Sequence, residues 1–499
     1  MNSALSREAR FPSRAEPAWF TAGLTMIFLA AAAALVPPLA LSFRHVSRTY
    51  NEGWNAFWAD ASRSGTLYPS ADSLIANNYP PLSFHLVALV GRLIGDNVIA
   101  GRLVALASLG VVVLAAFLWL RTTGSARRIA LAGAAFVLVV FATYGEDYIA
   151  MNDPQMLAHA FMLSALVILW RFDFSRRAVL AGALLMLLGG FTKHLLIPLP
   201  VAMTIWIASY RRERLGAWLA CFAVGVPLGL WLTWSSYPPF VDDLFSARVY
   251  VLDQGMSATR HALIRLSPLL AIGAVPLVKQ LCARSGASLP PRTVLVSLYV
   301  FASLLIGAVA SGGEGVTRNA FFDLLIASSL FAALGLEWLW ANSRTPRLLG
   351  LSVAPAMMVV VGALLCLYGI WLVPQTVSEV REAEALEQDT RTMVQMIQRL
   401  GKGRAACETI ALCYWARGQF TMDFFNYGEK LRTGAVSVAS CTAALQRGEF
   451  PVLQLEVGHR NPPGWRIWPC SPAIAQYYTE AFRSRLGTLL VPKQALAKL

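Results

Sequence analysis

The chain has 499 residues, of which 56% are hydrophobic and only 14% are charged. Soluble proteins of this size carry about a quarter charged residues, so the composition argues against an ordinary soluble enzyme and predicts a polytopic membrane protein. The formal net charge of +14 would suit a polyanion such as nucleic acid, but the basic residues are distributed in a way that membrane topology explains.

Apolar segments recur along the whole chain, many of them close to the length of about 20 residues that a membrane-spanning helix needs. The first has no small-residue cleavage site after a short apolar core, so we expect an anchor and not a signal peptide. The sequence predicts about eleven membrane-spanning helices, at residues 20–42, 97–120, 129–145, 155–170, 178–192, 195–210, 216–234, 267–282, 293–311, 320–341 and 349–373.

The charges between these segments predict the orientation. If the N-terminus is cytoplasmic, the short loops on the inner side are strongly basic, and the outer loops carry more acidic than basic residues. Basic residues favour the cytoplasmic side of a membrane protein. We therefore expect a multi-pass chain with a cytoplasmic N-terminus and an extracytoplasmic C-terminal tail.

The domain organisation follows from this topology. Inside the first outer loop, Leu82–Ile94 is too short to span and is expected to lie as a helix at the outer surface. The predicted parts are a cytoplasmic N-terminus (1–19), a transmembrane body (20–375) with long outer loops at 43–96 and 235–266, an amphipathic connector (376–404) and a small extracytoplasmic α+β domain (405–499).

The predicted tail holds an even number of cysteines, which are Cys407, Cys413, Cys441 and Cys470. Extracytoplasmic compartments are oxidising, so these four residues fit one or two disulfides. Three complete pairings are compatible with the sequence, and four free buried thiols are the alternative.

The first outer loop begins with YNEGWNAFW, residues 50–58. Trp54 and Trp58 lie four residues apart, so they share one face of a helix, as aromatic residues at a membrane interface do. Glu52 has two interpretations. It is either an acid favoured in the first turn of that helix, or a partly desolvated carboxylate at the water–lipid boundary that acts as a general base.

Three further outer positions carry polar groups. Asp153 precedes Pro154, a pattern typical of a helix start. Lys193 and His194 interrupt two spans on the outer side, where a cation either snorkels to the interface or holds a phosphate. Arg318 lies in a Gly-rich outer turn, followed by Asn319, and a guanidinium with exposed backbone amides favours phosphate oxygens.

We found no Cys/His metal spacing, no phosphate-binding loop and no nucleophile elbow. The sequence therefore predicts no metal ligands and no cofactor. A divalent cation would be compatible with the chemistry but is not indicated.

The order of these motifs resembles the GT-C fold membrane glycosyltransferases. The relevant features are an acidic residue after the first span, a YPPL segment before a surface helix, an Asn-Asp-Pro sequence at the outer start of a span, and Gly-Phe-Thr-Lys between two spans. The chain is most similar to the bacterial relatives of protein O-mannosyltransferases, including the aminoarabinose transferase of lipid A and the rhizobial lipopolysaccharide galacturonosyltransferases. The resemblance covers about residues 15–375.

This resemblance implies an enzyme that moves a sugar from a polyprenyl-phosphate carrier to lipid A or lipopolysaccharide, a glycan or a protein on the outer face. It also implies a bacterial inner membrane and a periplasmic C-terminal tail. By position, Glu52 and Asp153 match the catalytic acids, and Tyr79 and Lys193 match the substrate-binding segments. Many relatives have Asp where this chain has Asn51, and some have a phosphate-binding Lys in place of Tyr79.

The same chemistry follows from the residues. Single displacement of the phosphate inverts the anomeric centre, Glu52 is expected to take the acceptor proton, and Lys193, His194 and Arg318 to stabilise the phosphate. Trp54 seats the helix at the interface or stacks on sugar, and Asn319 adds a polar contact. A membrane transporter and a non-catalytic envelope-assembly protein are the alternative functions.

Overall fold

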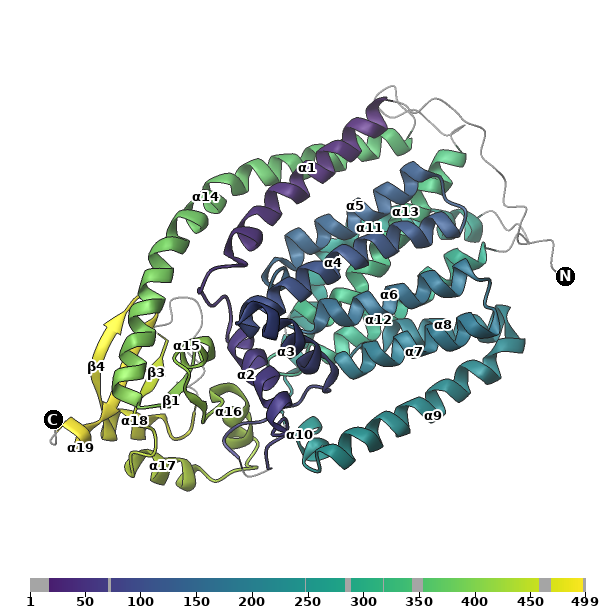
Figure 1. Ribbon diagram of the computed structural model, residues 1–499. Helices are drawn as coiled ribbons and strands as arrows, with labels where there is room; N and C mark the ends of the chain where they lie inside the picture. The colour runs from purple at the N-terminus through teal and green to yellow at the C-terminus, as the bar shows by residue number, and fades with distance from the viewer. Residues whose placement is uncertain are drawn as a thin grey trace.

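The computed structural model describes residues 18–70, 73–246, 248–282, 289–316, 318–342, 353–456 and 468–496. The predicted cytoplasmic N-terminus (1–19) therefore lies almost wholly outside the described residues. The described chain forms a bundle of long helices with a small mixed α/β region at one end (Figure 1).

Each predicted span coincides with a helix. The helices at the predicted spans are α1 (Ala18–Leu41), α4 (Asn97–Thr122), α5 (Arg127–Tyr144), α6 (Gln155–Arg171), α7 (Arg176–Thr192), α8 (Pro198–Tyr210), α9 (Arg212–Ser236), α11 (Leu252–Cys282), α12 (Pro291–Ala310), α13 (Phe322–Ala341) and α14 (Val353–Gly401). Within the described residues, seven of them are long and apolar enough to cross a membrane, or eight if the bent α14 counts as one span. The other three, α6, α7 and α8, are shorter, with 17, 17 and 13 residues. The chain is thus a multi-pass helical membrane protein, as the composition predicted.

Helix α13 forms the centre of the bundle. It packs against α5, α11 and α12, and nearly all of its residues are buried within the protein. A helix that is apolar on all sides is buried in protein or in lipid, and neighbouring helices surround α13. By contrast, α9 is almost entirely exposed, as expected of a helix that faces lipid.

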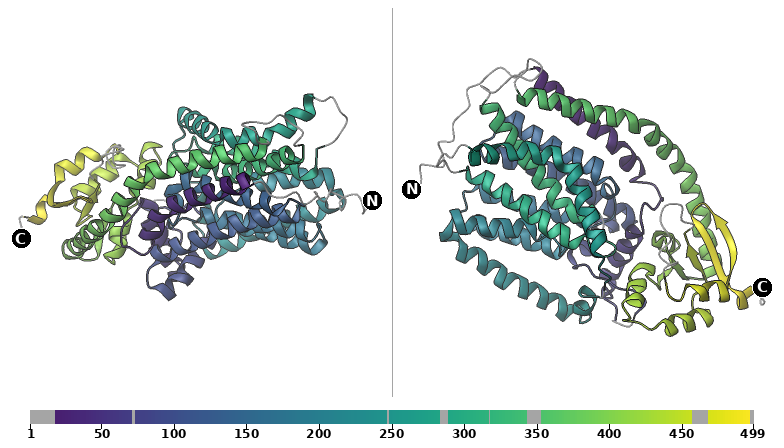
Figure 2. Two further views of the ribbon diagram at one scale, coloured as in Figure 1. Left: turned by 90° about the horizontal axis from the view of Figure 1, so that it is seen from above. Right: turned by 180° about the vertical axis from the view of Figure 1, so that it is seen from behind.

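Helix α14 joins the bundle to the tail. Its first half packs along α1 at one edge of the bundle, and the helix then continues to the tail sheet (Figures 1 and 2). It bends by 43° between Tyr368 and Val373. Pro374 follows the bend, and a proline inside a helix removes a backbone hydrogen bond and favours a kink. The predicted last span and the predicted connector are therefore one continuous helix.

Short elements cover one end of the bundle. They are α2 (Tyr50–Ser64), α3 (Leu82–Ile94), η1 (Glu146–Tyr148), α10 (Phe240–Leu244) and η2 (Arg318–Phe321). Helix α3 has the bounds that the sequence predicted. Both α2 and α3 end at a glycine with positive φ, Gly65 at 75° and Gly95 at 86°, which is a usual way to end a helix.

The tail is an α+β domain, as predicted. Its five-stranded sheet has the order β2-β1-β3-β5-β4, with β1 parallel to β2 and β3, and β5 antiparallel to β3 and β4. The strands are β1 (Arg404–Cys407), β2 (Gln419–Phe420), β3 (Leu453–Leu455), β4 (Tyr478–Ser484) and β5 (Gly487–Pro492), and the helices are α15 (Ile410–Trp415), α16 (Phe424–Arg432), α17 (Val438–Gln446), α18 (Ser471–Tyr477) and α19 (Lys493–Leu496).

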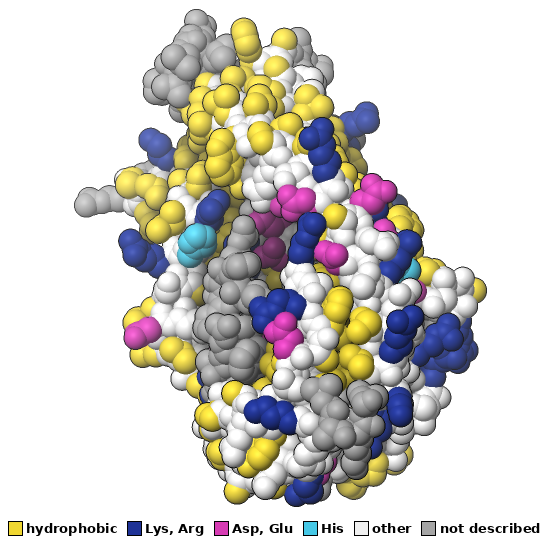
Figure 3. Space-filling model, turned by 90° about the vertical axis from the view of Figure 1, so that its left-hand side faces the viewer, with side chains coloured by type: hydrophobic (Ala, Val, Ile, Leu, Met, Phe, Trp, Pro, Cys, Tyr) yellow, Lys and Arg dark blue, Asp and Glu magenta, His cyan; other side chains and the backbone are white. Residues whose placement is uncertain are grey.

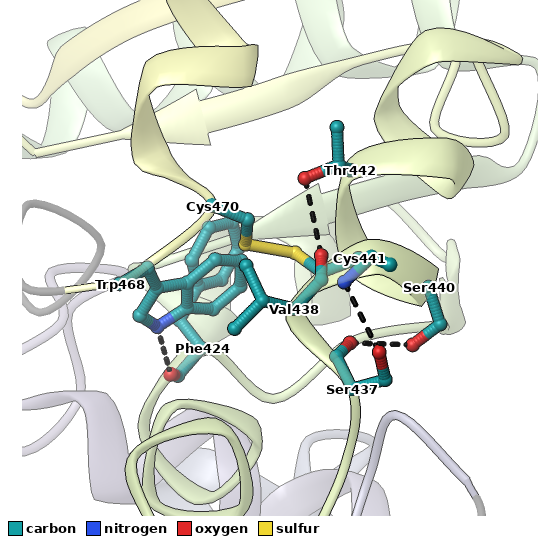
Figure 4. Close-up of a disulfide and its surroundings, with 9 residues drawn as sticks. Phe424, Ser437, Val438, Ser440, Cys441, Thr442, Trp468 and Cys470 are labelled. Atoms are coloured by element: carbon teal, nitrogen blue, oxygen red, sulfur yellow. Dashed lines mark hydrogen bonds between the residues drawn. A yellow bond between two sulfur atoms is a disulfide. The ribbon is translucent and has the colours of Figure 1, made fainter. Parts of the chain in front are cut away.

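The structure selects one of the three disulfide pairings. Cys407 pairs with Cys413, which ties β1 to α15, and Cys441 pairs with Cys470. Beside the second disulfide, the indole of Trp468 stacks on Phe424 and donates a hydrogen bond to the Phe424 carbonyl (Figure 4). Both disulfides therefore lie in the core of the tail.

Serine replacement tests this pairing. We expect the Cys441→Ser/Cys470→Ser variant to lose about 3.5 kcal/mol of tail stability, because the disulfide restricts a loop with a sequence separation of 29 in the unfolded chain. The corresponding loss for Cys407 and Cys413, separated by six residues, is about 2 kcal/mol. Urea unfolding of the full chain measures the loss, with the free Cys221 replaced as the control. Identical migration of wild type and the four-serine variant on non-reducing gels would contradict both disulfides.

Candidate active site

Glu52 is fully buried in the first turn of α2 and binds Arg102 of α4. The Arg102 Nε donates to Glu52 Oε1 and its Nη2 donates to Oε2, both at 2.7 Å. The backbone N–H of Arg48 also donates to Oε2, at 2.9 Å. Both carboxylate oxygens thus accept charge-assisted bonds in a fork geometry, and the side chain has no exposed surface.

The Glu52–Arg102 pair fastens the segment between α1 and α2. Arg102 also donates to the backbone carbonyls of Leu41, Arg44 and Val46, so its donors are shared between the carboxylate and that segment. This environment differs from the predicted one, because the sequence suggested a carboxylate at the water–lipid boundary. The geometry is that of a positioning residue.

Glu52 reaches the second predicted acid through Asn152. The side chain of Asn152 donates to the Glu52 carbonyl at 3.0 Å, and Asn55 of α2 donates to the Asn152 carbonyl at 2.8 Å. The next residue is Asp153. The first turn of α2 therefore holds the turn that precedes α6, so Glu52 and Asp153 are brought together through the backbone.

Asp153, Lys193 and Tyr79 form a buried cluster. The Lys193 Nζ lies 3.6 Å from Asp153 Oδ1 and 3.8 Å from the centre of the Tyr79 ring. Asp153 Oδ1 also accepts from the backbone N–H of Gln155 at 2.8 Å, so the predicted helix-capping role is present. The other oxygen, Oδ2, and the Lys193 Nζ have no hydrogen-bond partner among the described residues. Leaving such groups unpaired in a protein interior is costly.

A polar chain continues from this cluster into the bundle. The side chain of Gln155 lies 3.2 Å from His159 Nε2, and His159 Nδ1 lies 4.0 Å from Asp323 Oδ1. Tyr299 donates to the same Asp323 oxygen at 2.6 Å. Ionisable groups inside a membrane bundle are costly and usually serve function.

The tail approaches this cluster through Trp54. The Trp54 Nε1 donates to Asp423 Oδ2 at 2.9 Å, and its ring centre lies 5.0 Å from that of Tyr79. Burial raises the pKa of the Asp423 carboxyl, although hydrogen bonds from Asn426 and Trp54 oppose the shift. Trp54 is only 2% exposed, so it packs the body against the tail and does not present its face to lipid or to sugar.

The remaining predicted cations are placed differently from one another. His194 is exposed next to Lys193. Arg318 is half-exposed and pairs with Glu146 at 3.2 Å and Asp147 at 3.5 Å, so acidic neighbours already balance its charge. Asn319 is buried in η2, directly after Arg318.

Sequence reasoning did not single out Arg248, a half-buried residue of the segment 235–266, which the charge pattern predicts to be an outer loop. Its guanidinium donates to the Glu314 carbonyl at 2.9 Å and to Asn426 Oδ1 at 3.3 Å, and lies 5.5 Å from the centre of the Phe425 ring. The Arg248 and Lys193 side chains both interact electrostatically with His194, so the two cations lie near the same residue. Its position in a long outer loop was the only signal in the sequence. Across the described ranges, no group of three or more His, Cys, Asp and Glu side chains is arranged to hold a metal ion.

No family model matches the chain, and no curated protein matches it in sequence. Among solved structures, it is similar to ArnT from Cupriavidus metallidurans in the apo state, with a TM-score of 0.59 and 15% identity over 95% of this chain and 99% of that chain. The same ArnT bound to undecaprenyl phosphate gives a TM-score of 0.58 and 14% identity over 95% and 98% of the two chains. The chain therefore has the GT-C fold that the sequence predicted.

Proposed function

We propose that this protein is a glycosyltransferase that moves a sugar from a polyprenyl-phosphate carrier to an acceptor on the outer face of a bacterial inner membrane. The observation that carries the proposal is the buried pair of Asp153 Oδ2 and Lys193 Nζ, each without a hydrogen-bond partner among the described residues. The phosphate of the carrier and the hydroxyl group of the acceptor would supply those partners. The GT-C fold and the bound carrier of the similar ArnT structure support it.

In the proposed reaction Asp153 is the general base. The acceptor hydroxyl oxygen forms a bond to the anomeric carbon, its proton moves to Asp153 Oδ2, and the bond from the anomeric carbon to the phosphate oxygen breaks. The electron pair stays on the phosphate, whose charge Lys193 stabilises. One displacement inverts the anomeric centre. Glu52 positions Asp153 through Asn152.

Transfer from a labelled carrier tests the function itself. Membranes that contain the protein are supplied with a radiolabelled sugar linked to undecaprenyl phosphate, and the label is followed in lipid, glycan and protein fractions. We expect label in an acceptor together with release of undecaprenyl phosphate. A transporter would move the intact carrier or sugar across the membrane, and an assembly protein would leave the carrier unchanged. Either outcome would contradict the proposal.

Lys193 and Arg248 are the proposed phosphate-binding cations. Replacing either with Met removes a charge-assisted bond of about 1.5–3 kcal/mol, so we expect affinity for undecaprenyl phosphate to fall about ten- to hundredfold. Equilibrium binding to the purified protein measures the loss. Arg318→Met is the matched control, because Glu146 and Asp147 already neutralise that residue. A larger loss in Arg318→Met than in the other two variants would assign the phosphate to Arg318.

A further inference from the structure

A cavity of about 640 Å³ lies between α2, α14 and α15, away from the Asp153 cluster. Its volume is within the range of roughly 300–1,000 Å³ that ligand pockets occupy. Figure 3 shows the face of the molecule that carries α14 and the tail, where apolar side chains gather at the upper end and acidic and basic side chains lie close together below them. The residues that line the cavity come from α2, α14, α15 and the start of α4, so the cavity lies where the tail meets the helical bundle.

Aromatic rings form part of the cavity wall. Phe57 of α2 and Tyr414 of α15 meet edge to face with ring centres 5.3 Å apart, and Trp415 follows directly. The Tyr414 hydroxyl accepts from the backbone N–H of Asn97 at 3.2 Å, so its own proton is available for a ligand. Aromatic side chains with a polar atom suit ligands that have both an apolar face and hydroxyl groups.

The two carboxylates in the wall are bonded differently. Asp96 accepts from Val98 N, His45 and Trp415, and these bonds outweigh the effect of burial and hold the pKa of Asp96 below its ordinary value. Asp60 accepts from Asn97 through one oxygen and lies 3.7 Å from Arg63. The Asp60 side chain is 49% exposed. Asp96 is therefore structural, whereas Asp60 offers an acceptor to a ligand.

The charges in the wall cancel. The wall contains two positive side chains, Arg391 and Arg417, and two negative ones, Asp60 and Asp96. An anion or a cation in the cavity would therefore meet a side chain of its own charge. A neutral molecule with many hydroxyl groups uses the donors and the acceptors together. The composition of the wall therefore favours a neutral polyhydroxylated ligand over a phosphate or a metal ion.

The wall is also held rigidly. Tyr414 and Trp415 follow Cys413 directly, and the Cys407–Cys413 disulfide fixes that point of α15 to β1. On the other side, Gly53 of α2 packs against the backbone of Ala411, with no room for a Cβ atom. Rigid walls reduce the entropy lost on binding.

We propose that this cavity is a binding site for a neutral saccharide unit. Phe57, Tyr414 and Trp415 contact the apolar face of the sugar ring, and Asp60, Arg391 and Arg417 bond its hydroxyl groups. Helix α2 connects the two sites, because its Trp54 contacts Tyr79 of the Asp153 cluster and its Phe57 and Asp60 line the cavity. The claim that the cavity binds a sugar does not depend on the proposed function. The further claim that this sugar is the non-reacting part of a glycan acceptor does rest on it.

Saturation-transfer NMR on the full chain in nanodiscs, free of glycoside detergents, tests the site. The probes are the methyl glycosides of glucose, galactose, N-acetylglucosamine and rhamnose, with methyl galacturonide as the anionic comparison. We expect a saturation-transfer signal from at least one neutral glycoside. This signal should be at least threefold weaker in the Asp60→Asn and Trp415→Leu variants. The exposed Arg447, which pairs with Glu449 on the tail surface, gives the control variant Arg447→Gln, which should bind as wild type does.

Three results would overturn the proposal. They are the absence of a saturation-transfer signal from every neutral glycoside, equal signals in wild type and Asp60→Asn, or a stronger signal from the galacturonide than from all neutral probes. Asp60 is half-exposed, so Asp60→Asn decides the question even if Trp415→Leu fails to fold. Asp153→Asn should bind the glycosides normally. A protein that binds the glycosides but does not transfer sugar would contradict the proposed function of the Asp153 cluster and leave the cavity proposal intact. A protein that transfers sugar but does not bind the glycosides would contradict the cavity proposal alone.

Discussion

Replacing Asp153 with Asn is expected to lower sugar transfer by about 10²–10⁴-fold, the usual contribution of general acid–base catalysis. The amide keeps the shape of the carboxyl group but cannot accept the proton of an acceptor hydroxyl. Asn caps helices about as well as Asp, so the bond that the Gln155 N–H donates to Oδ1 at 2.8 Å should persist. The measurement is initial transfer rate with saturating labelled carrier.

The buried Lys193 is the risk in this experiment. Asp153→Asn removes the charge that faces the Lys193 Nζ at 3.6 Å, and an uncompensated buried charge destabilises a protein. The double variant Asp153→Asn/Lys193→Met removes both charges and should fold even if the single variant does not. Thermal unfolding of both variants separates a folding defect from a catalytic one.

Asp147→Asn is the matched control for Asp153→Asn. Asp147 is mostly exposed and pairs with Arg318 at 3.5 Å, so its replacement should leave transfer within about twofold of wild type. Normal transfer by a folded Asp153→Asn variant would reduce Asp153 to a helix cap. Loss of transfer in the Asp147 variant instead would move the base to η1.

Local patterns in the sequence predicted most of the fold. Hydropathy gave a helix at each predicted span, and α3 has the predicted bounds, because an apolar run bounded by Pro81 and Gly95 defines a helix without tertiary information. The cap at Asp153 is also local. The continuous α14 was not anticipated, since the change from apolar to charged residues near 375 suggested two elements. The helix instead passes through Pro374 with a bend and does not end there.

The partners of the site residues depend on contacts between distant parts of the chain. Glu52 meets Arg102 across 50 residues, and Trp54 meets Asp423 across 369. One signal was available for the first pair. Arg102 lies within a predicted span, and a charged residue there almost always has a partner. The outer loop before this span offered several acids, among them Glu52, Asp60 and Asp96, so this rule would have predicted a buried pair without identifying its acid. No comparable rule joins Trp54 to the tail.

Replacing Glu52 with Gln is expected to destabilise the protein by about 3–5 kcal/mol, because Arg102 then remains charged and buried without its counter-ion. Arg102 is fully buried, as is Glu52. The loss should appear as a lower thermal unfolding midpoint and a lower yield in membranes. Transfer per folded molecule should fall less than in Asp153→Asn, because Glu52 acts on Asp153 through the Asn152 backbone.

The double variant Glu52→Gln/Arg102→Met distinguishes the positioning role from a catalytic one. If Glu52 chiefly neutralises Arg102, removing both charges should restore part of the stability that the single variant loses, since partners in one network are not additive. A stable Glu52→Gln protein whose sugar transfer falls by 10²-fold or more would contradict the positioning role and identify Glu52 as the general base. The hydrogen bonds make that outcome unexpected. Both Glu52 oxygens are already occupied by two bonds from one guanidinium and a third from the Arg48 N–H, whereas Asp153 Oδ2 accepts no bond within the described chain and is open to the proton of an acceptor hydroxyl.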